Sequence, residues 1–514
     1  MTALLALASV TWALGGEQAA AVTRSQPPAS SSSWTAYDDS GGTGSMAAVN
    51  TSARAWTSPA LDGEIYGQPL VSSGHVYVAT ENDTVYELSA ATGAVVWSTR
   101  VGSPVPSADL PCGDITPTAG ITGTPVIDQS RAEIFVVADE LVNGRPAHMF
   151  AGLSTASGKI EVTEDVDPAG ADPAALLQRT GLALDDGRVV FGMGGNDGDC
   201  ASYRGRVIAE PEQGGTPEMF TVDSGSDESQ GAIWMGGAAP VVDSSGDIWV
   251  SAGNGSVYSY SHAYDNSDSI LQLSPSLKLV QFFAPATWAA NNSSDLDMSV
   301  APALLSDGQV ILTGKSRIVY LLNRADLGGI GGQQAALGSV CSQDIDGGVA
   351  VQGTTVYLPC TSGIVAVRAV KFPAALHLLW SSGTGGGPPI VAAGLVWTIG
   401  QNGMLYGLDP ATGSVRQQAS IGTPANHFPS PSAADGLLLA PSADQVVSFA
   451  AAAHAPATSP TPAPAPSDAA ASQAGSGSSA GGVFPAAAIA IAVGVVGVLV
   501  VIGGAFWLGR RRRT

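Results

Sequence analysis

The feature that most constrains the fold of this chain is an internal repeat. Residues 74–97 (GHVYVATENDTVYELSAATGAVVW) align without a gap with residues 394–417 (GLVWTIGQNGMLYGLDPATGSVRQ). Each copy contains an apolar run after a glycine, an asparagine-centred turn, a second run that ends in leucine, and an Ala-Thr-Gly turn into a third run. Short alternating runs separated by such turns are typical of antiparallel strands. The repeat therefore predicts a chain built from small β units.

Weaker copies of the same unit begin near Pro125, Leu184, Pro240, Pro302, Gly348 and Ser432. With the two strong copies they make eight units, and four-stranded units of this size match the blades of a β-propeller. The last copy stops near Ala450 after three strands, so we expect residues 53–59, around Trp56, to supply its outer strand and close the ring. We therefore predict an all-β, eight-bladed β-propeller over residues 34–451. The alternative, a two-sheet sandwich, does not explain a blade-length repeat.

The phrase Ala-x-Thr-Gly-x-Val-x-Trp at residues 90–97 resembles the blade motif of the quinoprotein alcohol dehydrogenase family, the eight-bladed PQQ-type propellers. In that family the glycine turns the chain and the tryptophan wedges between neighbouring blades. The resemblance covers roughly residues 34–450. It implies the fold more strongly than the function, because the same blades occur in non-enzymatic relatives such as the propeller lipoprotein of outer-membrane assembly.

The resemblance also implies a set of site residues. In the dehydrogenases a quinone lies on a tryptophan floor beside a Ca²⁺ or lanthanide ion, an aspartate acts as general base, and a basic residue polarises the quinone oxygen. Segments that match the family's pattern supply Trp234 as the floor, and Asp197, Asn254 and Asp295 as metal ligands. Asp295 also matches the general base, Asp297 matches the extra carboxylate of lanthanide-type members, and Lys315 matches the basic residue. Oxygen ligands of this kind suit hard cations.

The sequence departs from the family in several respects. The adjacent cysteine pair over the quinone is absent, because Cys112 is followed by Gly113. Asp197 is shorter than the glutamate it replaces, although Asp199 lies close by in sequence. No haem-attachment motif appears, so an electron acceptor would come from elsewhere.

Each candidate also has a structural interpretation without function. Trp234 is then a packing residue between blades, and Asn254, between two glycines, is a left-handed turn residue. Asp295 and Asp297 then belong to a solvated loop, and Lys315 is a surface cation. The order of the candidates over three consecutive blades favours the functional interpretation.

The four cysteines allow three disulfide pairings. Cys341 and Cys360 bracket one hairpin-sized segment, which leaves Cys112 and Cys200 for each other. The alternative is that they are small buried thiols. Their spacing contains no Cys-x-x-Cys, so neither a zinc site nor covalent haem is indicated.

The two ends of the chain predict its location. A short apolar run in residues 1–21, which ends in three alanines, indicates a signal peptide, although the usual basic start is missing. Residues 452–482 are a linker rich in Pro, Ala, Ser and Gly, and residues 483–508 are long and apolar enough for one transmembrane helix; a buried core helix is the alternative. The arginine-rich tail, residues 509–514, marks the cytoplasmic side. We expect a single-pass cell-membrane protein with its propeller outside.

Charge narrows the range of partners. The chain carries 21 Lys and Arg against 43 Asp and Glu, a net charge of −22, which disfavours nucleic acid. We therefore predict a membrane-anchored, extracytoplasmic propeller that acts as a ligand-binding or protein-interaction scaffold, with an unknown protein or small molecule as partner. The alternative is an alcohol or sugar dehydrogenase that depends on PQQ and on Ca²⁺ or a lanthanide.

Overall fold

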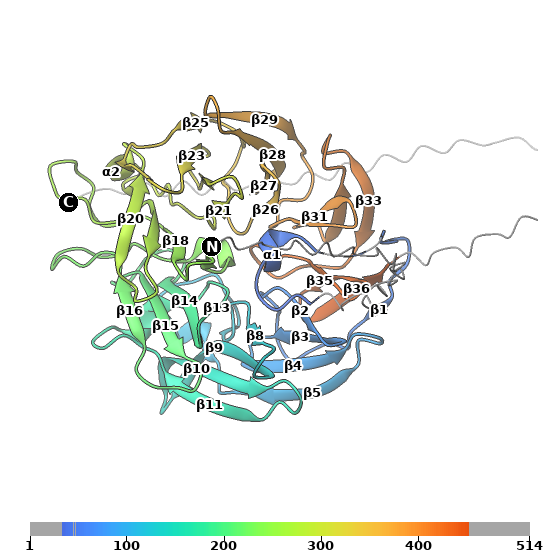
Figure 1. Ribbon diagram of the computed structural model, residues 1–514. Helices are drawn as coiled ribbons and strands as arrows, with labels where there is room; N and C mark the ends of the chain where they lie inside the picture. The colour runs from blue at the N-terminus through green and yellow to red at the C-terminus, as the bar shows by residue number, and fades with distance from the viewer. Residues whose placement is uncertain (1–32, 45, 47, 452–514) are drawn as a thin grey trace, which may run out of the picture. The chain divides into compact units, whose positions relative to one another are not determined.

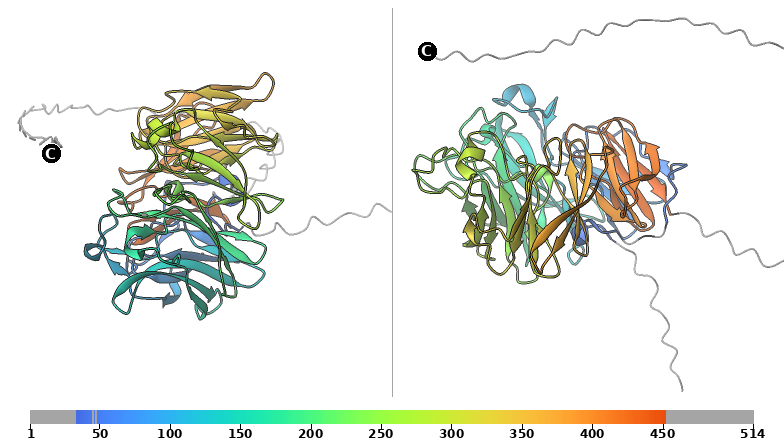
Figure 2. Two further views of the ribbon diagram at one scale, coloured as in Figure 1. Left: turned by 90° about the vertical axis from the view of Figure 1, so that its left-hand side faces the viewer. Right: turned by 90° about the horizontal axis from the view of Figure 1, so that it is seen from above.

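The computed structural model describes residues 33–44, 46 and 48–451. These residues form eight main β-sheets arranged radially around a common centre, as Figure 1 shows along the ring axis and Figure 2 shows in two perpendicular views. The prediction of an all-β, eight-bladed propeller is confirmed.

We number the blades in chain order. Blades one and two consist of β2 (Leu70–Ser72), β3 (His75–Ala79), β4 (Thr84–Ser89) and β5 (Val95–Arg100), then β8 (Val126–Asp128), β9 (Glu133–Val142), β10 (Arg145–Ser154) and β11 (Ile160–Asp165). Blades three and four consist of β13 (Ala183–Asp185), β14 (Arg188–Gly195), β15 (Arg206–Pro211) and β16 (Glu218–Thr221), then β17 (Val241–Val242), β18 (Ile248–Ala252), β19 (Ser269–Leu273) and β20 (Leu279–Ala284).

Blades five and six consist of β21 (Ala303–Leu304), β22 (Gln309–Leu312), β23 (Val319–Asn323) and β25 (Ala335–Leu337), then β26 (Ala350–Gln352), β27 (Thr355–Cys360), β28 (Gly363–Val370) and β29 (Ala375–Ser381). Blades seven and eight consist of β30 (Ile390–Ala392), β31 (Leu395–Gly400), β32 (Met404–Leu408) and β33 (Val415–Ser420), then β34 (Ser432–Ala434), β35 (Leu437–Ser442), β36 (Gln445–Ala450) and β1 (Trp56–Thr57).

A few short elements lie between the blades or add to them. β12 (Leu176–Leu177) pairs with β14, β24 (Gly329–Ile330) runs parallel to β20, and β6 (Val105–Pro106) pairs with β7 (Thr118–Ala119). The helical turns are α1 (Asp39–Gly42), α2 (Trp288–Asn292), η1 (Ser107–Asp109), η2 (Pro173–Ala175) and η3 (Met235–Gly237).

The ring closes as the sequence predicts. β1, from the N-terminal part of the chain, pairs antiparallel with β36, with Trp56 opposite Ser448 and Thr57 opposite Val447. Blade eight is thus made from both ends of the propeller. This pairing removes the two free sheet edges that an open array of blades would expose to aggregation.

Tryptophans on outer strands join neighbouring blades. Trp97 of β5 reaches blade two, where its Nε1 donates to the Thr155 carbonyl at 3.0 Å and its ring lies where a Cβ on Gly158 would stand, 2.5 Å away. Trp56 docks on Ala90 and Gly93 of blade one in the same way, and Trp380 of β29 docks on Pro410 and Gly413 of blade seven. The inter-blade wedge that the resemblance implies is therefore present at three junctions within the described residues.

The N-terminal segment crosses the centre of the ring, which the sequence analysis did not anticipate. Trp34 pairs with Val71 of blade one, and Thr43 pairs with Val391 of blade seven. Between them, Tyr37 Oη accepts a hydrogen bond of 3.1 Å from the Gly348 amide, and Figure 1 places α1 near the centre. Residues 34–44 thus plug the central channel.

The predicted signal peptide, linker, transmembrane helix and arginine tail lie outside the described residues. Among residues 33–44, 46 and 48–451, no helix has the length and apolar character needed to cross a bilayer. Membrane attachment therefore stays a prediction.

The wedge can be tested with two glycines of blade seven. Gly413 and Gly394 both have positive φ, +70° and +75°, so an alanine strains the backbone at either site by about 1 kcal/mol. Only at Gly413 does the new Cβ collide with a Trp380 ring carbon, at 2.4 Å, whereas nothing lies within 4 Å of it at Gly394. We expect Gly413→Ala to lower the free energy of unfolding by about 1–3 kcal/mol more than Gly394→Ala in urea titrations. Equal losses would contradict the wedge.

Candidate functional site

One cavity contains every candidate residue that the resemblance implied for cofactor, metal and catalysis. Its volume is about 590 Å³. The candidates lie on five connections or strand ends, within blades three to five or between them. They are Asp197, Trp234, Asn254, Asp295, Asp297 and Lys315. The blades therefore bring together side chains that are far apart in sequence.

Lys315, just after β22, forms the centre of the charged group in this cavity. Its Nζ lies 2.6 Å from Asp297 Oδ2 and 3.3 Å from Asp295 Oδ1. Burial lowers the pKa of Lys315, but the carboxylates of Asp297 and Asp295 outweigh that effect, so its pKa is raised above the ordinary lysine value. Lys315 is thus a fixed cation in the cavity and not a free surface lysine.

Asn254, at the end of blade four's β18, is held by both aspartates. Its backbone amide donates to Asp297 Oδ1 at 2.7 Å, and its Nδ2 donates to Asp295 Oδ1 at 2.9 Å. Gly253 is necessary for this approach, because a Cβ there would lie 2.6 Å from Asp297 Oδ1. Asn254 does not adopt a left-handed φ, so the turn interpretation is wrong.

The two aspartates differ in environment. The Asp295 side chain is 72% exposed, whereas that of Asp297 is 10% exposed. Asp295 has a φ of +55°, which turns the chain after α2 and directs it back into the ring. The solvated-loop interpretation therefore holds for Asp295 and fails for Asp297.

Asn292, at the end of α2, fixes the neighbouring wall, and the sequence analysis did not identify it. Its Oδ1 accepts from the Gly255 amide at 3.0 Å, and its Nδ2 donates to the Val257 carbonyl at 2.9 Å. Asn291 likewise donates to Asp268 at 2.6 Å. A run of asparagines and serines resembles a solvated loop by composition, and only the contacts show that these two are buried.

Trp234 forms an aromatic side of the cavity. Lys315 Nζ lies 5.4 Å from its ring centroid, within range of a cation–π interaction. Phe428, from the connection between blades seven and eight, lies 6.1 Å away, centroid to centroid. Trp234 is partly buried against blades two and three, so the packing interpretation is also correct in part.

The β14–β15 connection carries Asp197 and Asp199. Asp197 is exposed and lines the cavity, but no hydrogen bond or ion pair joins it to Asn254 or Asp295 in the described part of the chain. Asp199 Oδ1 accepts from the Tyr203 hydroxyl at 2.7 Å, and burial with the nearby Asp297 and Asp295 raises its pKa. The predicted disulfide Cys112–Cys200 is confirmed, and it ties this connection to the one between β6 and β7.

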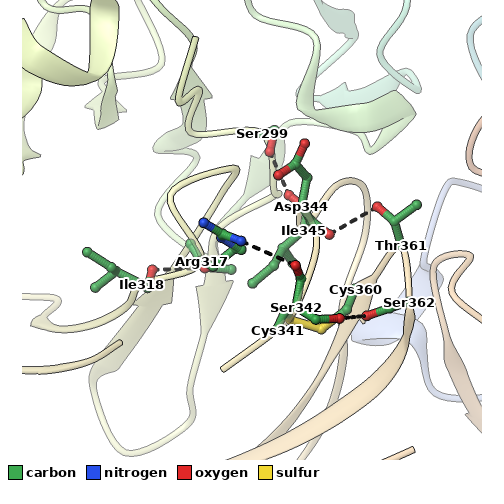
Figure 3. The surroundings of a disulfide bond; sticks show 11 residues. Ser299, Arg317, Ile318, Cys341, Ser342, Asp344, Ile345, Cys360, Thr361 and Ser362 are labelled. Atoms are coloured by element: carbon green, nitrogen blue, oxygen red, sulfur yellow. Dashed lines mark hydrogen bonds between the residues drawn. A yellow bond between two sulfur atoms is a disulfide. The ribbon is translucent and has the colours of Figure 1, made fainter. Parts of the chain in front are cut away.

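The second predicted disulfide, Cys341–Cys360, is also confirmed and joins the connection before blade six to the end of its strand β27 (Figure 3). Around it, Ser342 Oγ donates to Ser362 Oγ at 2.9 Å and Arg317 Nη1 donates to the Ser342 carbonyl at 3.2 Å. Ser299 Oγ donates to the Ile345 carbonyl at 2.6 Å. The disulfide thus anchors the connection between blades five and six, which runs from β25 to β26.

The cavity is also lined by residues that no sequence pattern identified. Arg179, which follows β12, is buried and lies over the Tyr66 ring, 5.8 Å from guanidinium carbon to ring centroid. Asp114 pairs with His427 Nδ1 at 2.6 Å, and this hydrogen bond holds the pKa of Asp114 below its ordinary value. These residues belong to no recognisable motif, and only the fold brings them to the same cavity as Trp234.

The oxygen donors agree with a hard cation in kind but do not form a complete site. Asn254 Oδ1 is buried and accepts no hydrogen bond, which suits a metal ligand. However, the Lys315 ammonium already pairs with both Asp295 and Asp297, and in the described part of the chain no hydrogen bond or ion pair joins Asp197 to them. Within the described ranges, no three His, Cys, Asp or Glu side chains converge in a way that could hold a metal ion. The residues thus do not fit the metal in this arrangement.

Comparison with known proteins agrees with the fold. A family model described as outer membrane protein assembly factor BamB matches residues 35–326, more than half of the chain. The chain therefore belongs to this family of PQQ-type β-propeller proteins. No curated protein gives a significant match by sequence.

Solved structures share the architecture at low sequence identity. Quinohemoprotein alcohol dehydrogenase ADHIIG from Pseudomonas putida HK5 is 14% identical, with a TM-score of 0.61 over 80% of this chain and 78% of that one. A europium-containing methanol dehydrogenase is 14% identical, with a TM-score of 0.56 over 77% of this chain and 93% of that one. BamB from Moraxella catarrhalis is 13% identical, with a TM-score of 0.51 over 78% of this chain and 98% of that one. At these identities the likeness shows the fold alone.

The ion pair at the centre of the cavity gives a stability prediction. Lys315→Met leaves the buried Asp297 without its counter-ion, which costs roughly 3 kcal/mol of unfolding free energy. The matched control is Lys159→Met, whose exposed pair with Glu161 contributes about 0–1 kcal/mol. Urea titration measures both. Adding Asp297→Asn to Lys315→Met should recover part of the loss, and similar losses in the two lysine variants would argue against the ion pair.

Proposed function

We propose that this propeller binds a small molecule in its axial cavity, outside the cell, and that residues 483–508 anchor it to the membrane. The observation that carries the proposal is the convergence of Trp234, Asn254, Asp297 and Lys315 on one cavity of about 590 Å³. A few converging polar groups beside aromatic walls, in a cavity of this size, are typical of ligand sites. A propeller that served only as a spacer would need none of them.

The walls divide the work of binding. Trp234 and Phe428 offer aromatic surface for a flat part of a ligand. Lys315 offers a cation, and the exposed Asp295 offers a carboxylate that accepts hydrogen bonds from a hydroxyl or an amine. Tyr258, exposed on the loop after β18, adds a ring at the edge of the cavity.

The scaffold could instead bind a protein partner. The family supports this role, because it is described as an assembly factor. We favour the small molecule because the polar residues line a cavity instead of an exposed face. The two roles are compatible, because the outer strands of the blades stay available to a partner.

A specific observation supports a second candidate, a quinone-dependent alcohol or sugar dehydrogenase. Trp234, Lys315 and Asp295, which match the family's quinone floor, basic residue and general base, line the same cavity. Bound PQQ would supply the redox chemistry. Two of the similar structures are alcohol or methanol dehydrogenases, one of them containing europium. The incomplete set of metal ligands counts against this candidate.

Ligand binding is tested on the purified full chain. Small molecules released on denaturation are identified by mass spectrometry and compared between the wild type and Trp234→Ala. We expect one compound to be enriched in the wild type, because the variant loses an aromatic wall of the cavity, and to rebind at least tenfold more weakly to the variant. Lys159→Met is the control and should retain the compound. Equal release from wild type and Trp234→Ala contradicts the proposal.

The dehydrogenase candidate is tested separately by titrating PQQ alone, with Ca²⁺ and with La³⁺, following tryptophan fluorescence and then the reduction of a dye in the presence of alcohols or sugars. Since Lys315 occupies the space between the two aspartates, we expect neither metal to increase PQQ affinity by as much as tenfold, and we expect no dye reduction. Dye reduction that Asp295→Asn abolishes would establish the dehydrogenase instead.

A further inference from the structure

We propose that Arg179 is the carboxylate-binding group of this cavity, and that the ligand is a small organic acid with a flat apolar body. The inference rests on the proposed ligand-binding function and specifies its ligand class. Among the described residues, no hydrogen bond or ion pair joins Arg179 to Lys315, Asn254 or the two aspartates beside them.

The first observation is that Arg179 is a buried cation without a counter-ion. It is 8% exposed and lines the cavity. Its one hydrogen bond is a long one, 3.4 Å from Nη2 to the His427 carbonyl, and its other contact is the Tyr66 ring. Among the described residues, no carboxylate lies within ion-pairing distance of its guanidinium. A buried charge without a partner is costly, so proteins normally pair such groups.

The carboxyl groups nearest to Arg179 are already engaged. Asp114 Oδ2 accepts from His427 at 2.6 Å and from Asn426 at 2.9 Å. Glu81 accepts from the Gly120 amide at 2.7 Å, and burial raises the pKa of Glu81 to about 8, which keeps it protonated at neutral pH. Tyr37, below Arg179, is neutral because burial raises its pKa. The counter-charge for Arg179 must therefore come from a ligand.

The second observation is a backbone cradle for the guanidinium. Met235, Gly236 and Gly237 all have positive φ values, of 42°, 55° and 89°. A Cβ on Gly237 would lie 2.3 Å from Arg179 Nη1. Since a left-handed methionine is strained, this turn costs stability, and such strain is concentrated at functional sites. The chain thus spends stability on a conformation that leaves room for one arginine.

The surroundings select the ligand. The planar fork of a guanidinium matches a carboxylate with two parallel hydrogen bonds. The cavity also carries Asp114, Asp197, Asp199, Asp295 and Asp297 against Lys315 and Arg179, so a doubly charged phosphate would be repelled more strongly than a carboxylate. The walls around Arg179 include apolar and aromatic side chains, those of Tyr66, Ile115, Leu177, Trp234 and Phe428.

The test compares acids with their neutral counterparts. Isothermal titration of the full chain uses benzoate and benzamide, indole-3-acetate and indole-3-acetamide, PQQ and its trimethyl ester, and inorganic phosphate. We expect at least one acid to bind the wild type tenfold or more tightly than its neutral partner, and phosphate not to bind. Arg179→Gln should abolish that preference, and Arg179→Lys should keep part of it. Arg416→Gln, which removes an exposed pair with Asp409, is the control and should behave as the wild type.

Folding is checked in the same variants. Because Arg179→Gln removes an unpaired buried charge, it should raise the melting midpoint of the ligand-free chain while neutral counterparts still bind. Equal affinity for acid and neutral partner, an acid preference that survives in Arg179→Gln, or no binding of any acid at millimolar concentration would each overturn the proposal. Where neutral partners or the co-purified compound still bind, the ligand-binding function stands and only the carboxylate subsite fails. If the neutral partners and the co-purified compound also fail to bind, both the ligand-binding function and the carboxylate subsite are overturned.

Discussion

The structure depends on the contact between a tryptophan of one blade and a glycine turn of the next. The indole covers a backbone that has no side chain, and its N–H satisfies a carbonyl of the same turn, so one residue supplies both apolar packing and a specific hydrogen bond. The contact also fixes the angle between neighbouring sheets. Where it recurs, at Trp56, Trp97 and Trp380, it favours a ring with this number of blades over an open stack.

The candidate site exists because of this ring geometry. Asn254, Asp297 and Lys315 lie on different blades or connections, and each is held by backbone that a neighbouring blade supports. Their mutual distances are therefore set by inter-blade packing and not by local sequence. A change in packing far from the cavity would move these groups relative to one another.

The sequence predicted much of this structure because blades repeat and are local. The eight copies of the repeat and the truncated last copy predicted the blade number and the pairing of β1 with β36. Cysteine spacing favoured the two disulfides that the structure contains, with buried thiols as the alternative. The resemblance selected six residues that line one cavity. Within the described residues, hydrogen bonds and ion pairs connect Asn254, Asp295, Asp297 and Lys315 to one another, and none connects Asp197 to them.

What the sequence did not reveal depends on single long-range contacts. Residues 34–44 have no repeat pattern, so their position across the centre could not be predicted. Arg179 belongs to no motif, and its importance comes from the absence, among the described residues, of a carboxylate within ion-pairing distance, which no sequence pattern records. Asn292 looks like part of a polar loop until its partners on the β18–β19 connection are known.

The closing strand has a consequence for how the protein is made. Trp56 is synthesised early, but its partner Ser448 is among the last propeller residues to emerge. Blade eight is therefore the final blade to be completed, and until then the first-made segment has an unpaired strand edge. Contacts so distant along the chain form slowly. An unpaired strand edge can pair with another chain, so the completion of blade eight ends an aggregation-prone stage of folding.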